Sequence, residues 1–274
     1  MDRFLVTPDW LADHAAEVVV LDCSWSIPEA GRNPRAEFEA GHLPGARFLD
    51  LDAISDADSP YVNMLPDAAQ FARVVGDLGV GADTQVVLYD SGYVSARVWW
   101  MFRHFGHGAV AILDGGLSRW QAEGRPLETG PAPAPLPAAF PLRGEAADVA
   151  DWHAVHQALE DGSALVLDAR TRERFTGELP SGYPGVAGGH MHGAVNLPWG
   201  GLKPEGGFLP VDAARTLMAQ AGVDDRPVIA TCGSGVTAAI LLFQLARMGR
   251  SDVRLYDGSW HEWGQRDDLP KESL

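Results

Sequence analysis

Short apolar runs alternate along the chain with longer segments of helical periodicity. Four of the runs are rich in β-branched residues and apolar at consecutive positions: Val18 to Asp22, Gln85 to Asp90, Ala164 to Ala169 and Pro227 to Cys232. Strands that helices cover on both faces carry such continuous runs, whereas strands with one wet face alternate. The pattern therefore predicts parallel strands covered by helices, which is an α/β fold.

Two helical segments directly follow such a strand. The segment from Val236 to Gly249 is apolar nearly all round, and its last glycine is placed as a C-terminal stop. The segment from Ser95 to Gly106 has the same character and the same ending. We expect both to form buried helices.

The chain also contains an internal repeat. GHLPGA from Gly41 recurs 148 residues later as GHMHGA, and LDGGLSRW from Leu113 recurs 143 residues later as YDGSWHEW. Between the halves, Pro126 to Pro141 holds six prolines, whose fixed φ and missing N–H disfavour helices and central strands. We expect an N-terminal domain over residues 1–125, a proline-rich linker over 126–143 and a C-terminal domain over 144–274, each domain of ordinary size.

Charge and cysteine content narrow the class of protein. The 274 residues carry a formal net charge of −16, which repels phosphate backbones and anionic lipid and disfavours nucleic-acid or membrane partners. Cys23 and Cys232 are too few for a disulfide framework, and the first residues carry acids where a signal peptide has a basic and then an apolar run. The apolar stretch from Val228 to Ala246 is interrupted by polar residues and glycines. These features predict a cytoplasmic protein with free thiols and no membrane anchor.

The loop from Cys232 to Thr237 joins a predicted buried strand to a predicted helix, the place where open α/β sheets bind ligands. Its glycines let the backbone curl until N–H groups point inward, and a helix N-terminus adds partial positive charge. A sulfur at the centre would be stabilised as the thiolate, the nucleophilic form of cysteine. We therefore predict that Cys232 is a nucleophile and that its sulfur is bound by the main-chain amides of Gly233, Ser234, Gly235, Val236 and Thr237.

The first half carries a degenerate copy of this loop. Aligning the repeat pairs Asp90 with Cys232 and Tyr93 with Gly235. Cys232 could instead be a small buried packing residue, but replacement of such a residue by a carboxylate is unusual, so the pairing favours a site that lost its chemistry in one half. Cys23 follows a strand without a glycine loop, and we interpret it as structural.

Similar loops serve cysteine phosphatases and arsenate reductases, in which an arginine six positions after the cysteine binds the oxyanion. Ala238 stands at that position here. A phosphate would lack its bidentate partner, so a cysteine phosphatase or arsenate reductase stays as a less favoured alternative.

CGSGVTA at 232–238, the GHxPGA-like segments and DGSWHEW at 257–263 resemble the tandem rhodanese-fold sulfurtransferases of the mercaptopyruvate type, over almost the whole chain. The resemblance implies two tandem rhodanese-like domains, each a mainly parallel sheet covered by helices, and an enzyme that needs no cofactor. It implies that Cys232 takes the sulfane sulfur of 3-mercaptopyruvate and releases pyruvate. The resulting persulfide would pass the sulfur to a thiol such as that of thioredoxin, or to cyanide.

The resemblance assigns further roles. Arg174 matches the arginine that holds the donor's carboxylate, and Ser234 matches the loop serine of the mercaptopyruvate type. That serine is linked in the family to an aspartate, matched by Asp52, and to a histidine, whose place Asn63 takes. Tyr183 stands where a second substrate arginine is expected. Since asparagine forms hydrogen bonds but relays no proton, thiosulfate stays open as the main donor, which would make the protein a thiosulfate:cyanide sulfurtransferase.

Structural interpretations remain for these residues. Arg174 could pair with a neighbouring glutamate, Asp52 could cap a turn, and Ser234 could only shape the loop. His190 and His192 have no further metal ligands nearby in the sequence, which favours loop hydrogen bonds over a metal site. A non-enzymatic persulfide carrier, modified at the cysteine without turnover, is the remaining alternative.

Overall fold

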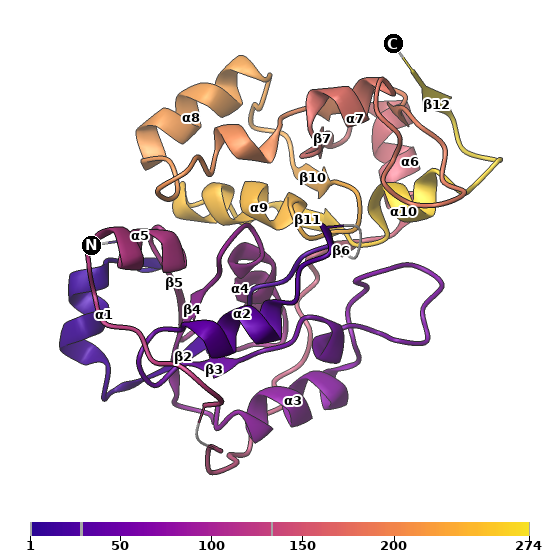
Figure 1. The fold of residues 1–274 in the computed structure, drawn as a ribbon. Coiled ribbons are helices and arrows are strands. Elements are labelled where there is room, and N and C mark those ends of the chain that lie inside the picture. The colour runs from indigo at the N-terminus through magenta and orange to yellow at the C-terminus, as the bar shows by residue number, and fades with distance from the viewer. Residues whose placement is uncertain (1, 28–29, 133, 274) are drawn as a thin grey trace. The chain divides into compact units, whose positions relative to one another are not determined.

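A computed structural model describes residues 2–27, 30–132 and 134–273 of the chain (Figure 1). The chain forms two compact units. Unit 1 comprises Met1–Ala57, Leu65–Ala146 and Glu205–Phe208, and unit 2 comprises Asp58–Met64, Ala147–Pro204 and Leu209–Leu274. Each unit therefore contains a short segment from the other half of the sequence.

Unit 1 is built on a parallel five-stranded sheet in the order β1-β5-β4-β2-β3. Its strands are β1 (Leu5–Val6), β2 (Val18–Asp22), β3 (Arg47–Phe48), β4 (Gln85–Tyr89) and β5 (Val110–Leu113). Its helices are α1 (Pro8–His14), α2 (Pro34–Ala40), the 3-10 helix η2 (Asp52–Ile54), α3 (Ala68–Asp77), α4 (Ser95–His104) and α5 (Gly116–Ala122). The apolar strands are covered because the helices pack on the sheet (Figure 1).

Unit 2 repeats this plan with a parallel sheet in the order β6-β11-β10-β7-β9 and a separate antiparallel pair, β8 with β12. Its strands are β6 (Val149–Ala150), β7 (Leu165–Asp168), β8 (His190–Met191), β9 (Val195–Asn196), β10 (Val228–Thr231), β11 (Val253–Tyr256) and β12 (Lys271–Glu272). Its helices are α6 (Trp152–Asp161), α7 (Arg172–Thr176), the 3-10 helix η3 (Trp199–Gly201), α8 (Val211–Gln220), α9 (Ala238–Arg247) and α10 (Ser259–Trp263).

The predicted α/β fold and the internal repeat are confirmed. The two five-stranded sheets share one strand order, and β2 coincides with the predicted run from Val18 to Asp22. The predicted helix after Cys232 is α9, which is buried over most of its length and is followed by Gly249 with a φ of 85°. The fold thus places Cys232 at the end of a central strand, directly before a buried helix.

The proline-rich segment and the segment before α3 lie differently from expectation. The main-chain N–H of Ala138 donates to Gly76 at 2.9 Å, and the buried Phe140 packs against Phe71 and Phe102. Residues 134–146 therefore pack with unit 1, whereas the sequence predicted a separate linker over 126–143. An apolar side chain can still be buried where prolines exclude regular structure. Asp58–Met64, expected in the N-terminal domain, belongs to unit 2.

None of the helices described combines the length and the apolar character that crossing a bilayer requires. The apolar helix α9 of unit 2 has ten residues, which is about half of the length that a membrane-spanning helix needs.

Candidate active site

Cys232 lies where β10 gives way to the loop before α9. The residue is buried, with 1% of its surface exposed. Two main-chain hydrogen bonds tie the loop to α10: the carbonyl oxygens of Cys232 and Gly233 accept the N–H groups of Trp260 and His261, both at 2.9 Å. The thiol is thus held near the N-terminus of a ten-residue helix, whose dipole favours an anion.

The side chain of Ser259 shapes the same loop. Its Oγ accepts the N–H groups of Cys232 at 3.1 Å and Gly235 at 3.0 Å, and donates to the carbonyl of Tyr256 at 2.8 Å. Ser259 has a φ of 49°, a left-handed conformation that few residues other than glycine adopt. Sequence reasoning missed this residue. The repeat carries the signal, because the matching position is Gly116, which has a φ of 53°.

Unit 1 shows how the matching loop binds an anion. Asp90 follows β4 as Cys232 follows β10, and its carboxylate accepts three main-chain N–H groups. Oδ1 accepts from Gly92 at 2.7 Å, while Oδ2 accepts from Val94 at 2.7 Å and Ser95 at 2.5 Å. Asp90 is 4% exposed. The loop before α4 therefore forms a buried cradle of amides around a negative charge.

The repeat shows which residues of unit 2 correspond to the donors of this cradle. The three donors in unit 1 match Ser234, Val236 and Thr237 of unit 2. The N–H of Gly235 is used by Ser259. The residue that matches Gly233 is Ser91, whose N–H donates to Ser24 and not to Asp90. Of the five amides expected to bind the sulfur, that of Gly235 therefore donates to Ser259 instead, and contacts of the other four with the sulfur stay a prediction.

The two glycines of the loop are required by space and by backbone angle. A Cβ on Gly233 would lie 2.9 Å from Tyr183 Oη, so any larger residue would displace that tyrosine. Gly235 has a φ of 76°, which favours glycine. Tyr183, the residue in place of the expected second arginine, therefore lies directly against the loop that carries the cysteine.

Ser234 and Asn63 lie in contact, as the resemblance implied for the loop serine and the residue in the place of its histidine partner. Asn63 Nδ2 donates to Ser234 Oγ at 2.9 Å, and both residues are buried. Asn63 has a φ of 60°, which asparagine tolerates better than most residues. Asp52 lies in unit 1, where its exposed carboxylate accepts Trp25 Nε1 at 3.1 Å. A link from Asp52 to the serine stays a prediction.

Arg174 lies in α7, and its guanidinium reaches the segment that leads to Tyr183. Nη1 donates to the carbonyl of Ser181 at 3.4 Å, and a Cβ on Gly182 would lie 2.5 Å from the same nitrogen. Among the ion pairs of the described residues, none involves Arg174. Its role in binding the donor's carboxylate stays a prediction.

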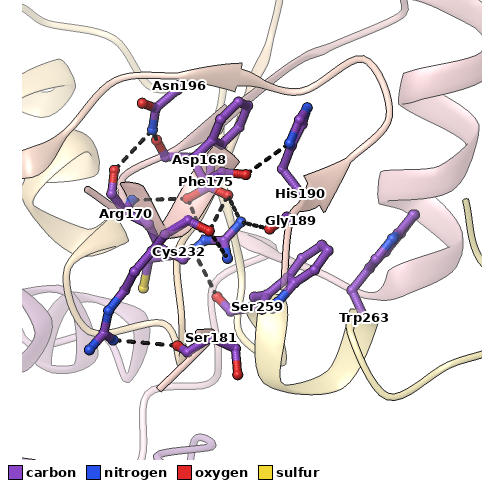
Figure 2. Close-up of polar contacts among 12 residues, drawn as sticks. Asp168, Arg170, Phe175, Ser181, Gly189, His190, Asn196, Cys232, Ser259 and Trp263 are labelled. Atoms are coloured by element: carbon purple, nitrogen blue, oxygen red, sulfur yellow. Dashed lines mark hydrogen bonds and ion pairs between the residues drawn. The ribbon is translucent and has the colours of Figure 1, made fainter. Parts of the chain in front are cut away.

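A buried ion pair that sequence reasoning missed lies beside the loop (Figure 2). Asp168, at the end of β7 and paired in register with Thr231 of β10, lies 2.7 Å from Arg170 Nη2. The same nitrogen donates to the carbonyl of Gly189 at 2.9 Å, and the guanidinium lies 4.5 Å from the ring centroid of Trp260. The pair therefore fixes α10, and with it Ser259, against the ends of two central strands.

Two titratable side chains of α10 lie next to these contacts. Burial lowers the pKa of His261 from its ordinary value. Burial also raises the pKa of Glu262, an effect that nearby hydrogen bonding and Arg266 oppose. Both shifts favour the neutral form of the side chain.

The remaining cysteine and the paired histidines have structural partners. Cys23 is fully buried, and its thiol donates to the carbonyl of Tyr89 at 3.1 Å. His190 Nδ1 bonds the carbonyl of Phe175 at 2.9 Å, and His192 Nδ1 lies 2.6 Å from a carboxylate oxygen of Glu272. In the described ranges, no group of three or more His, Cys, Asp or Glu side chains is arranged to hold a metal ion.

Comparisons with known proteins agree with this geometry. The rhodanese-like domain family matches residues 7–123 and 151–266. Human 3-mercaptopyruvate sulfurtransferase is 42% identical over 96% of this chain and 93% of its own length, and rat thiosulfate sulfurtransferase is 37% identical over 96% and 93%. The crystal structure of SseA from Escherichia coli, a 3-mercaptopyruvate sulfotransferase, matches with a TM-score of 0.86 and 38% identity over 95% of this chain and 99% of that one.

Proposed function

We propose, from the premise that this chain belongs to the rhodanese-like family and is a sulfurtransferase, that Cys232 carries sulfur from a small anionic donor to a thiol acceptor. The Cys232 thiolate attacks the sulfur of 3-mercaptopyruvate. The carbon–sulfur bond breaks, its electron pair forms the enolate of pyruvate, and a proton equivalent to the donor's thiol proton completes the methyl group. The acceptor thiolate then attacks the outer sulfur of the Cys232 persulfide, which leaves a new persulfide on the acceptor and restores the thiolate.

One observation carries this proposal: the carboxylate of Asp90 held by three amides in the matching loop of unit 1. The same backbone pattern around Cys232 would stabilise a thiolate before the first step and a persulfide anion after it. Fixed dipoles that stabilise a developing charge need no reorganisation during the reaction, which makes them effective catalytic groups.

The neighbouring side chains would bind the donor. Arg174 would hold the carboxylate of 3-mercaptopyruvate, since a guanidinium matches a carboxylate in charge and geometry. Ser234 Oγ accepts a hydrogen bond from Asn63, which leaves the serine O–H to donate. We propose that it donates to the donor's carbonyl oxygen, where the enolate charge develops.

The residues of the Cys232 loop bear on the choice of sulfur donor, and the state of the two cysteines bears on the acceptor. The Gly-Ser loop lacks the basic residues typical of thiosulfate-type members, which favours 3-mercaptopyruvate. Asn63 and Tyr183 in place of a histidine and an arginine favour some use of thiosulfate, whose leaving sulfite needs no protonated carbon. Cys23 and Cys232 are both thiols and are not joined in a disulfide, which supports a reducing cytoplasmic setting, in which a thiol such as that of thioredoxin can accept the sulfur.

Steady-state formation of pyruvate from 3-mercaptopyruvate, and of thiocyanate from thiosulfate and cyanide, tests the proposal. Cys232→Ser should lower both rates by at least about a thousandfold, because the nucleophile of both half-reactions is lost. Cys23→Ser is the matched control and should retain both rates. Retained turnover in Cys232→Ser would refute the assignment, and one equivalent of product without further turnover in the wild type would indicate a carrier instead of an enzyme.

The ratio of the two rates tests the role of Asn63. Asn63→His places an imidazole beside Ser234. Because an imidazole can act as a general base and an amide cannot, the rate of pyruvate formation relative to thiocyanate formation should rise several-fold. Asn63→Ala, which removes the hydrogen bond without adding a base, is the control. An unchanged ratio in the histidine variant would remove Asn63 from the choice of donor.

A further inference from the structure

His261 connects the Cys232 loop to a segment from the other half of the sequence. Its main-chain N–H donates to the carbonyl of Gly233 at 2.9 Å. Its ring Nδ1 accepts the main-chain N–H of Val62 at 3.1 Å. Val62 lies within Asp58–Met64, which packs as part of unit 2 although it precedes α3 in the chain. One residue of α10 therefore contacts both the catalytic loop and this segment.

The hydrogen bond fixes the protonation state of the ring. A nitrogen that accepts an N–H carries no proton, so Nδ1 is bare and the ring proton of neutral His261 lies on Nε2. Burial lowers the pKa of His261, which keeps the ring neutral at neutral pH. The ring packs between two phenols: its centroid lies 4.7 Å from that of Tyr183 and 6.0 Å from that of Tyr61.

The segment is attached to the catalytic loop at two neighbouring points. Val62 is held by His261, which itself bonds Gly233, and the next residue, Asn63, donates to Ser234 Oγ at 2.9 Å. Because Asn63 has a left-handed φ of 60°, its side chain reaches the serine only while the backbone beside it keeps this conformation. The bond from Val62 to His261 is one contact that holds the backbone next to Asn63.

We propose that His261 is a positioning residue for sulfur transfer: its neutral ring holds Asn63 on Ser234, and protonation of Nδ1 releases it. The inference rests on the proposed function of the Cys232 loop. Protonated Nδ1 becomes a donor and faces the N–H of Val62, so the bond is lost. Since the pKa of His261 is lowered in the fold, the contact is present above the ordinary histidine range and is lost as the pH falls through the lowered value.

The titratable groups around the His261 ring come from the Asp58–Met64 segment, from Tyr183, from the Cys232 loop and from α10 itself. The phenol rings of Tyr61 and Tyr183 face the imidazole ring of His261. The main-chain N–H of His261 donates to the loop that contains Cys232. Glu262 follows on the same helix, but its carboxylate lies against Gly258.

Variants at position 261 test the proposal through the pH dependence of kcat/KM for pyruvate formation. His261→Asn keeps an acceptor oxygen near the place of Nδ1 but does not titrate, so it should rescue most activity at pH 7.5 and lose the decline on the acid side. His261→Leu should lower kcat/KM about tenfold at pH 7.5, as expected when one hydrogen bond is lost, and should approach the wild type at acid pH, where the wild type has lost the same bond. His153→Asn, at an exposed histidine of α6, is the control and should keep the wild-type profile.

A double-mutant cycle shows whether His261 acts through Asn63. The double variant His261→Leu/Asn63→Ala should lose as much kcat/KM as Asn63→Ala alone. Once the Asn63 side chain is removed, His261 has no side chain left to position. Fully additive losses, or a wild-type acid limb in His261→Asn, would overturn the proposal.

Hydrogen exchange of the peptide that contains Val62 gives a readout independent of activity. After correction for intrinsic rates, its amide should be protected at pH 7.5, and should lose protection at acid pH and in His261→Leu. Protection that neither the variant nor pH changes would overturn the inference even in an active enzyme. Loss of protection together with absent turnover in the wild type would leave the positioning contact standing and refute the proposed function.

Discussion

The loops of Asp90 and Cys232 occupy the same place in two copies of one fold, yet they carry a carboxylate in unit 1 and a thiol in unit 2. Asp90 fills its own cradle with a carboxylate that three amides bind. Cys232 is smaller, and its loop is fixed from outside by Ser259, whose counterpart Gly116 has no side chain to do so. The comparison teaches that a loop can keep its ring of amide donors when a carboxylate stands in the place of the thiol.

The buried carboxylates at the ends of β7 and β2, Asp168 and Asp22, also have different partners in the two units. Asp168 is neutralised by Arg170, which also bonds Gly189. Asp22 ends the matching strand of unit 1 and has Ser24 where unit 2 has the arginine. Burial raises the pKa of Asp22, and the nearby Asp90 adds to the rise, although hydrogen bonds from Ser24 oppose it. The carboxylate at this position thus has an arginine counterion in unit 2 and hydrogen bonds from Ser24 in unit 1.

The largest expected effect comes from breaking the buried ion pair. Asp168→Asn leaves the guanidinium of Arg170 buried without its counterion, and should lower the free energy of unfolding by about 3–5 kcal/mol. Asp22→Asn, at the matching position, strands no cation and should change the free energy of unfolding by about 1 kcal/mol or less. Chemical denaturation of both variants measures the difference. Equal destabilisation would show that the two carboxylates play the same part.

Ser259 should have the next largest effect. Ser259→Ala leaves the N–H groups of Cys232 and Gly235 without their acceptor, at a cost of about 1–3 kcal/mol, and we expect kcat/KM to fall at least about tenfold because the loop loosens. Ser259→Gly loses the same bonds but relieves the left-handed backbone, so it should be the more stable of the two. If Ser259→Ala matched the wild type in stability and rate, the loop would not depend on this side chain.

The smallest effect is a pH dependence at Asp22. Because its pKa is raised in the folded state, the folded protein binds a proton that the unfolded chain has already lost. Its contribution to stability is therefore present below the unfolded pKa and is lost as the pH rises through the folded value. Relative to the wild type, Asp22→Asn should gain about 1 kcal/mol or less at pH 7 and nothing at pH 3.5. A gain that was larger at acid pH would contradict this sign.

The parts predictable from sequence were those fixed by local pattern. Continuous apolar runs predicted the central strands, and a glycine loop between strand and helix located Cys232. Ser259 and Arg170 escaped because they act on segments distant in sequence, through a tertiary hydrogen bond and a buried ion pair. The placement of Asn63 with unit 2 escaped for the same reason, since nothing in its local sequence shows which unit it packs against.

Intact-mass analysis with peptide mapping, after brief treatment with 3-mercaptopyruvate and removal of excess donor, tests the central claim most directly. One additional sulfur atom should be found on the peptide that contains Cys232, and cyanide should remove it as thiocyanate. An unchanged mass, or a sulfur atom found on Cys23 instead, would contradict the assignment of Cys232 as the sulfur carrier.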